Sequence, residues 1–203
     1  MSKYKFREHQ ITRTCDKTYQ DYHSYLPFLV RDFSGHCCYC NMSEKTLDVA
    51  SFQIDHFIPE NAFKGKRDEL RNKYDNLMLS CPKCNRAKSD QYTGDLTSPA
   101  IENDYFYNPD VVDYNTIFYR NELGGIWSDD EKGKAMIEKL RLYRPLHNYA
   151  WVLEKLDTII ARLEQEIQTS DGKKKKDLEA VQQRLMAEYY KKRAHFVAAY
   201  RKK

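Results

Sequence analysis

The spacing of apolar positions divides the chain into a mixed first part and a helical last part. Apolar and aromatic residues recur every three or four positions from Tyr19 to Leu29, which predicts a helix that Gly35 ends. The segment from Val49 to Ile54 is predicted to be a strand, and the short apolar run Leu77 to Leu79 a second one. A helix is expected to open at Asn85 and continue to Asp90. Strand, loop, strand and helix therefore follow one another in the order of a small mixed core.

Two stretches beside this core are expected to be less regular. Residues 60–74 are charged and contain Gly65, which predicts an exposed loop with some helix. Residues 91–127 are rich in Tyr, Asn, Asp, Pro and Gly, and their aromatic side chains indicate irregular or β structure packed on the core. Gly124 and Gly125 are expected to form a turn within this stretch.

Helices are predicted for most of the chain beyond Ser128. Ser128 and Glu131 have the spacing of a capping box, which would open a helix that runs until shortly before Pro145. Alternating steps of four and three, typical of a coiled-coil-like helix, then separate the apolar residues Tyr149, Leu153, Leu156, Ile160, Leu163 and Ile167. The segment 169–172 interrupts this stripe, which resumes between Leu178 and Phe196. An antiparallel helical hairpin is therefore predicted.

Length and composition allow one small domain with a helical appendage. The chain has 203 residues, of which 41% are hydrophobic and 32% are charged, enough for one core with a highly charged surface. We therefore predict an α+β protein with mostly helical flanks. Its parts would be an N-terminal helical and basic segment (1–34), a core with an aromatic-rich extension (35–127) and a C-terminal helical region (128–203).

The net charge of +4 is unevenly distributed along the chain. Residues 171–203 contain eleven Lys or Arg against four Asp or Glu, a balance of +7, so the preceding residues together carry −3. A basic end on a slightly acidic body is compatible with a phosphate-bearing partner. A solvated helix face explains the same charges equally well.

The cysteines indicate metal rather than disulfides. No apolar run approaches the roughly 18 residues that span a bilayer, and the start of the chain lacks an apolar signal core, so we expect a cytoplasmic protein. In that reducing compartment, six cysteines favour metal binding, whereas a disulfide framework is the alternative in an oxidising one.

Two Cys-x-x-Cys pairs, Cys37 with Cys40 and Cys81 with Cys84, predict one structural zinc site. Two residues between the cysteines of a pair let a tight turn aim both sulfurs at one ion, and two pairs complete a tetrahedral, closed coordination sphere. The gap between the pairs is longer than in a small zinc ribbon. The inserted segment contains the polar residues considered next.

A hydrolytic site is predicted between and just after the cysteine pairs. Because four thiolates leave zinc no open position, the chemistry needs another centre. Asp55 and His56 face opposite sides of an extended strand, unless a bend before Pro59 brings them together. His56 is the natural base for activating water. Asp55 and Asn85 are oxygen donors of the kind that Mg²⁺ or Mn²⁺ prefers.

Nearby polar residues allow both functional and plainer interpretations. Lys83, Arg86 and Lys88 are candidates for contacts with phosphates. An adjacent Asp and His are often only a surface hydrogen bond, Asn85 would serve equally as a helix cap, and Asn76 would satisfy a turn. The joint placement of these residues on a zinc-clamped scaffold favours the functional interpretation.

The order of these residues resembles the HNH endonucleases, which have the ββα-metal (His-Me finger) fold. The resemblance covers roughly residues 35–90. Its motifs are Cys37-x-x-Cys40, Asp55-His56-x-x-Pro59, Asn76-Leu77 and Cys81-x-x-Cys84-Asn85-x-x-Lys88.

This resemblance implies roles for four residues. His56 would be the general base, and Asn76 would steady the hairpin and orient it. Asp55 and Asn85 would hold the divalent metal. Asp55 stands where the family often has a His, and Asn85 replaces its last His; both departures favour Mg²⁺ over a metal bound through imidazoles.

The sequence therefore predicts a zinc-stabilised, metal-dependent DNA endonuclease. A small core before a helical tail is similar to the stand-alone HNH subunits of bacterial anti-phage systems, which often work beside an ATPase or sensor. The hairpin would then serve dimerisation or partner docking. Two alternatives remain: a non-catalytic zinc-knuckle adaptor for nucleic acid or protein, and a helical subunit of a larger assembly whose nuclease activity waits for a partner.

Overall fold

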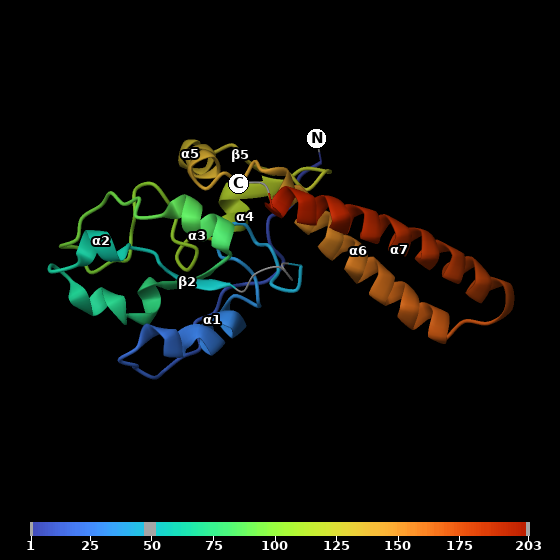
Figure 1. Cartoon of the computed structure of the whole chain (residues 1–203), viewed down its shortest axis with the longest axis horizontal. Coiled ribbons are helices and arrows are strands. Elements are labelled where there is room, and N and C mark those ends of the chain that lie inside the picture. Colours follow the sequence, from blue (N-terminus) through green and yellow to red (C-terminus); the bar gives the residue numbers. More distant parts are fainter. Residues whose placement is uncertain (1, 47–51, 202–203) are drawn as a thin grey trace. The chain divides into compact units, whose positions relative to one another are not determined.

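Figure 1 shows the fold as a computed structural model, which describes residues 2–46 and 52–201. The chain forms two compact units, Met1–Tyr143 and Arg144–Lys203. The first combines short strands with short helices, and the second is a pair of long helices, so the predicted α+β class is confirmed.

The centre of unit 1 is a two-stranded antiparallel sheet followed directly by a helix. Its elements are β2 (Gln53–His56), β3 (Leu77–Ser80) and α3 (Pro82–Lys88). All four residues of β3 are buried, which explains its unbroken apolar run. The helix begins three residues before the predicted start, because proline suits the first helical position, where its missing N–H is not needed.

The register of this sheet places the candidate residues at its end. Asp55 lies opposite Met78, and His56 opposite Leu77. The predicted strand began at Val49, but residues 47–51 lie outside the described part of the chain. The described strand starts at Gln53 and extends past Ile54 to His56.

Short helices fill the connection between β2 and β3. They are α2 (Glu60–Phe63), η2 (Asp68–Arg71) and η3 (Tyr74–Asn76). Each places a residue in the interior, namely Phe63, Leu70 and Asn76. The predicted loop with some helix is confirmed, although its apolar positions make it part of the core.

The N-terminal helix is shorter than its apolar spacing predicted. It consists of η1 (Tyr22–Tyr25) and α1 (Leu26–Asp32). The start is set by Asp21, whose carboxylate accepts a hydrogen bond from the His23 backbone N–H. At the other end Gly35 adopts φ +66° and its N–H donates to the Val30 carbonyl at 2.7 Å, so the predicted helix stop is confirmed.

Two basic residues that precede this helix, Arg7 and Arg13, form hydrogen bonds within unit 1. The Arg7 guanidinium is buried and donates to the Cys38 carbonyl at 3.3 Å. Arg13 donates to the Leu77 carbonyl at 2.8 Å and pairs with Asp110. These contacts tie the N-terminal segment to the central sheet, so its charge is only partly a surface property.

A second antiparallel sheet is built from the aromatic-rich stretch and the N-terminus. It contains β1 (Tyr4–Lys5), β4 (Phe118–Arg120) and β5 (Ile126–Ser128), flanked by α4 (Tyr114–Ile117) and α5 (Glu131–Lys139). The turn between β4 and β5 uses Gly124 at φ +79° and closes through the Asn121 N–H to the Gly125 carbonyl at 3.0 Å. The predicted turn is therefore confirmed.

The start of α5 differs from the predicted capping box. The cap is Asp130, whose carboxylate accepts from the Gly133 N–H at 2.7 Å. Ser128 instead donates its hydroxyl to the Ile117 carbonyl at 2.7 Å, because it belongs to β5. This helix ends at Lys139, earlier than predicted, and it lies in unit 1 rather than with the C-terminal helices.

Unit 2 is an antiparallel pair of helices, α6 (Pro145–Gln168) and α7 (Gly172–Arg201). The break falls within the predicted segment 169–172, so the hairpin is confirmed. Gly172 adopts φ +57° at the turn, a conformation that residues with a Cβ rarely adopt. Neither these helices nor any other described one is long and apolar enough to cross a membrane.

Arg120 connects the second sheet to the cysteine-bearing segment. Its side chain is only 2% exposed. One terminal nitrogen donates to the Cys40 carbonyl at 2.7 Å and the other to the Gly124 carbonyl at 2.8 Å. The guanidinium also lies over the Phe6 ring, 5.3 Å from its centroid.

We expect Arg120→Met to destabilise unit 1, because the buried carbonyls of Cys40 and Gly124 lose their donor. The free energy of unfolding should fall by roughly 2–4 kcal/mol. Urea unfolding followed by tryptophan fluorescence measures this change. Arg86→Met, at an exposed position of α3, is the matched control and should change it by less than about 0.5 kcal/mol. Equal stability of the two variants would contradict the linking role of Arg120.

Candidate functional site

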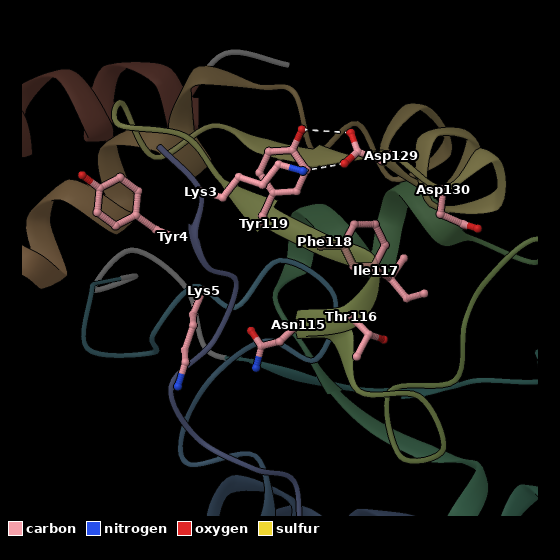
Figure 2. Close-up of a pocket in the computed structure, with 10 residues that line it drawn as sticks. All are labelled: Lys3, Tyr4, Lys5, Asn115, Thr116, Ile117, Phe118, Tyr119, Asp129 and Asp130. Atoms are coloured by element: carbon pink, nitrogen blue, oxygen red, sulfur yellow. Dashed lines mark hydrogen bonds and ion pairs between the residues drawn. The ribbon is translucent and has the colours of Figure 1, made fainter. Parts of the chain in front are cut away.

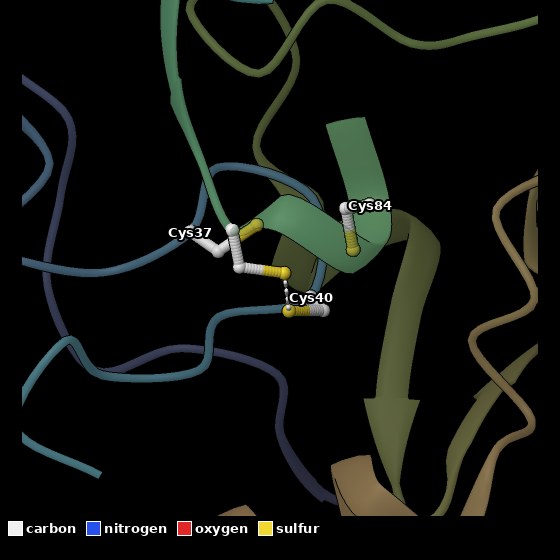
Figure 3. Close-up of side chains that lie close together, drawn as sticks. Cys37, Cys40 and Cys84 are labelled. Carbon is white, nitrogen blue, oxygen red and sulfur yellow. Dashed lines mark hydrogen bonds between the residues drawn. The ribbon is translucent and has the colours of Figure 1, made fainter. Parts of the chain in front are cut away.

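Four cysteine sulfurs meet in the interior of unit 1. The atoms of Cys37, Cys40, Cys81 and Cys84 all lie within 4.8 Å of one another, and each residue is buried. The sulfurs of Cys40 and Cys81 are 3.9 Å apart. Figure 3 labels three of these cysteines, Cys37, Cys40 and Cys84, and their side chains point toward a common centre.

Local backbone structure explains why the sulfurs converge. Cys37 and Cys40 lie in a tight turn, in which the Asn41 N–H donates to the Cys37 carbonyl at 2.9 Å and Asn41 adopts φ +58°. Cys81 precedes the first residue of α3 and Cys84 follows in its first turn. One pair therefore belongs to a knuckle and the other to a helix start.

The cluster fits a tetrahedral zinc ion. Zinc–sulfur bonds of about 2.3 Å place sulfurs about 3.8 Å apart, close to the distance between Cys40 and Cys81. Several buried thiolates repel one another, so a cation is needed to keep them together there. The described cysteines form no disulfide. The predicted cluster of four cysteines is therefore present, and it is consistent with a zinc clamp.

Asp55 is a buried carboxylate with two strong partners. Its side chain is 5% exposed. The Tyr39 hydroxyl donates to Oδ2 at 2.5 Å, and the Lys88 ammonium lies 3.0 Å from Oδ1. Burial raises the pKa of Tyr39 well above its usual value, which keeps this hydroxyl protonated as a donor. Tyr39 was not predicted as a site residue, although it lies inside the first Cys-x-x-Cys pair.

The position of Lys88 corrects its predicted contact with phosphate. The side chain is fully buried, and its ammonium donates to Asp55 Oδ1 and, at 2.7 Å, to the His56 carbonyl. A buried, paired ammonium cannot reach a polyanion at the surface. Lys88 instead holds α3 against the end of β2.

The side chain of His56 has different partners from that of Asp55, its neighbour in β2. Its Nε2 lies 2.8 Å from the Arg71 carbonyl, and its ring packs against Tyr22 and Phe63 with centroids 4.8 and 5.9 Å away. The predicted bend before Pro59 falls at Phe57 and Ile58, after both residues, because β2 stays extended as far as His56. As adjacent residues of an extended strand, Asp55 and His56 direct their side chains to opposite faces at the end of the sheet.

The surroundings of His56 favour a neutral imidazole. A carbonyl oxygen only accepts, so in the neutral ring Nε2 carries the proton and Nδ1 the lone pair. Burial lowers the pKa of His56, against smaller opposing effects of the Arg71 carbonyl and the Asp55 charge. The ring is thus oriented and available as a base near neutral pH.

Asn76 braces the segment that follows His56. It is completely buried, and its Oδ1 accepts from the Ile58 N–H at 2.8 Å. Its Nδ2 donates to the carbonyls of Ile58 and Leu70, each at 3.1 Å. The backbone adds a bond from the Phe57 N–H to the Asn76 carbonyl at 2.8 Å. Through these hydrogen bonds Asn76 connects the two ends of the loop between β2 and β3, as expected of a residue that steadies the hairpin.

Asn85 lies on α3, facing the same side of β2 as Asp55. Its Nδ2 donates to Gln53 Oε1 at 2.9 Å, and Gln53 alternates with Asp55 on one face of the strand. Lys88, three residues further along α3, reaches Asp55 itself. Asn85 and Lys88 thus contact two residues of one face of β2, and carboxylate and amide oxygens such as those of Asp55 and Asn85 are donors of the kind that Mg²⁺ or Mn²⁺ prefers. Lys83 and Arg86 lie on the same helix, and Arg86 is exposed.

A cavity on the other sheet of unit 1 does not belong to this site. It has a volume of about 330 Å³ and is lined by residues of β1, β4 and the segment before α5 (Figure 2). Its main polar contact is the ion pair of Lys3 with Asp129, with nitrogen and oxygen 2.6 Å apart on two exposed side chains. Such a pair is a surface feature and offers no buried reactive group.

Comparison with known proteins agrees with the geometry of the core. Residues 37–91 match the family model for HNH endonucleases. The Septu protein PtuA of Bacillus mycoides (strain KBAB4) is 27% identical over 135 residues, which cover 58% of this chain and 19% of that protein. The chain thus spans about a fifth of the length of this relative. No solved structure matches the chain significantly.

Four findings now coincide in one segment: the sulfur cluster, the β2–β3 hairpin, α3 directly after it, and the family match. The matched range, residues 37–91, nearly coincides with the range 35–90 over which the sequence resembles this family. Residues 37–91 are therefore an HNH endonuclease domain, which supports a nuclease-type function for this chain.

Proposed function

We propose that this protein is a metal-dependent endonuclease that hydrolyses phosphodiester bonds of DNA, with His56 as the general base. The observation that carries the proposal is the state of His56 at the end of β2. Its ring is oriented by the Arg71 carbonyl through Nε2, and burial lowers its pKa, so Nδ1 is available to accept a proton.

The proposed divalent ion, Mg²⁺ or Mn²⁺, would be held by Asp55 and Asn85. Both supply oxygen donors from adjoining elements, as these ions prefer. When bound, the ion would neutralise charge on a phosphate oxygen and on the leaving 3′ oxygen.

The chain's own groups would perform the proton transfer and the positioning. His56 Nδ1 takes a proton from water, whose oxygen then bonds to phosphorus while the bond from phosphorus to the 3′ oxygen breaks. That oxygen takes up a proton from solvent, which leaves a 5′-phosphate and a 3′-hydroxyl. Asn76 keeps the segment after His56 in place through its bonds to Ile58. Lys83 and Arg86 on α3 would contact the substrate backbone.

Zinc is the proposed occupant of the four-cysteine cluster. The sulfurs fit its tetrahedral geometry and leave no open position for a substrate, so the ion would stabilise the fold and take no part in hydrolysis. It would join the knuckle before β2 to the helix after β3.

A role in bacterial anti-phage defence is proposed from the similarity to the Septu protein PtuA. In that role the protein would cut DNA in the cytoplasm, together with a second copy or an ATPase or sensor protein. The α6–α7 hairpin, a compact unit of its own, is the candidate docking element.

The turn of the hairpin is proposed to contact the DNA backbone. Lys173 to Lys176 are exposed and occupy the first turn of α7. Positive charges are unfavourable at the positive end of a helix dipole. These lysines therefore lower the stability of α7 and concentrate positive electrostatic potential at its N-terminus. A phosphate backbone would compensate for both effects.

We expect His56→Ala to reduce the nicking of supercoiled plasmid by about 10²- to 10⁴-fold with Mg²⁺ present, because the variant lacks the proposed base that takes the proton from water. His195→Ala, at an exposed position of α7, is the control and should keep parental activity. Full activity of His56→Ala would exclude His56 as the base. A parent that cuts under no divalent ion would favour a non-catalytic adaptor.

We expect Cys81→Ser to release zinc and to lower the free energy of unfolding by about 4 kcal/mol or more, because a structural metal contributes directly to folding. Elemental analysis and thermal unfolding measure the two effects. Cys15→Ser, which removes a thiol outside the cluster, should keep the metal and the melting temperature. An unchanged melting temperature of Cys81→Ser would contradict the clamp.

We expect the triple variant Lys173→Gln, Lys175→Gln and Lys176→Gln to weaken DNA binding in a salt-dependent manner. The slope of log K against log salt should decrease in magnitude by about 2–3, since each phosphate contact contributes about 0.9. Fluorescence anisotropy on a labelled duplex measures the slope. Arg184→Gln with Lys191→Gln, exposed further along α7, should change it less. Equal slopes for both variants would contradict a contact at the turn.

A further inference from the structure

The ammonium of Lys88 is a buried charge in the described part of the nuclease domain. The side chain is fully buried, in contact with a carboxylate that is itself 5% exposed. Its Nζ lies 3.0 Å from Asp55 Oδ1 and 2.7 Å from the His56 carbonyl. A buried lysine needs such a counter-charge, because burial without it is strongly unfavourable.

Both oxygens of Asp55 already have a partner. Tyr39 donates its hydroxyl to Oδ2 at 2.5 Å, and Lys88 donates to Oδ1. A hydroxyl is neutral and leaves the carboxylate its charge, whereas an ammonium neutralises it. A divalent cation at Asp55 would therefore meet a positive charge within contact distance of the same oxygen.

Helix α3 carries both Lys88 and Asn85, the second proposed metal ligand, on the side that faces β2. Asn85 and Lys88 are three residues apart, the spacing that places two side chains on one helix face. One of them bonds Gln53 and the other Asp55, which share a face of β2. Lys88 thus occupies the interface where the proposed ion would bind.

We propose that Lys88 is the resident counter-ion of Asp55 in the metal-free protein, and that the divalent ion must displace its ammonium from Oδ1. This inference rests on the proposed metal site at Asp55 and Asn85. Lys88 then has two opposite effects. It stabilises the metal-free fold by neutralising a buried carboxylate, and it lowers the affinity of the site for the ion, so that the site fills only at higher metal concentration.

The test is a titration of the zinc-loaded 203-residue chain with Mn²⁺, in which electron paramagnetic resonance measures the free ion. Lys88→Met keeps the length of the side chain and removes the charge. We expect its Mn²⁺ dissociation constant to fall at least tenfold, and saturating Mn²⁺ to raise its melting temperature more than that of the parent. Asp55→Asn should abolish binding in both backgrounds.

Lys66→Met is the matched control, because it removes the same charge from an exposed position in the same unit. Its dissociation constant should stay within twofold of the parental value. An equal effect of both substitutions would show that net charge, not the bond to Asp55, sets the affinity, and would overturn the inference.

Two outcomes separate this inference from the proposed function. Unchanged or weaker Mn²⁺ binding in Lys88→Met, with binding still lost in Asp55→Asn, would refute the competition and leave the metal site standing. Mn²⁺ binding that survives Asp55→Asn would refute the metal site itself.

A measurement on the native chain covers the case in which Lys88→Met does not fold. In the absence of divalent ions, nitrogen NMR of lysine-labelled protein should show one slowly exchanging ammonium signal. The double variant Asp55→Asn and Lys88→Met replaces the ion pair by two neutral side chains, so the loss of the signal in this variant assigns it to Lys88. Saturating Mg²⁺ should remove this signal. A signal that persists, or that is missing before Mg²⁺ is added, would contradict the competition.

Discussion

The convergence of four buried sulfurs is the constraint on which the rest of the nuclease domain depends. A small domain with a short two-stranded sheet has little apolar area with which to fix its shape. The cysteines join the knuckle of Cys37 and Cys40 to the start of α3, on either side of the β2–β3 hairpin. Hairpin and helix are thereby held in one arrangement, and the residues at the end of β2 take their positions from it.

Two buried carboxylates of unit 1 have specific partners. Asp55 lies between Tyr39 and Lys88, and Asp32 accepts hydrogen bonds from Tyr74 and Thr14. Such pairs add little net stability but are costly to break, so they determine which arrangement of the loops is allowed.

Much of the fold and of the site was predictable, because the relevant information is local. The spacing of Cys37, Cys40, Cys81 and Cys84 determines a clamp, since two intervening residues suit a knuckle or a helix turn. The alternation of three and four residues beyond Pro145 determines two helices. Other local signals were misleading: Ser128 resembles a helix cap, but its hydroxyl is used by a neighbouring strand.

The sequence by itself determined the clamp, the order of strand, strand and helix, the hairpin and the identity of the candidate base. Only the tertiary structure decided where charges lie. It buried Lys88 against Asp55, turned Arg120 to the Cys40 carbonyl, and placed the Arg71 carbonyl at His56. The physical reason is that a side chain's burial and partners depend on residues distant in the chain, whereas helix and strand periods and cysteine spacing depend on neighbours.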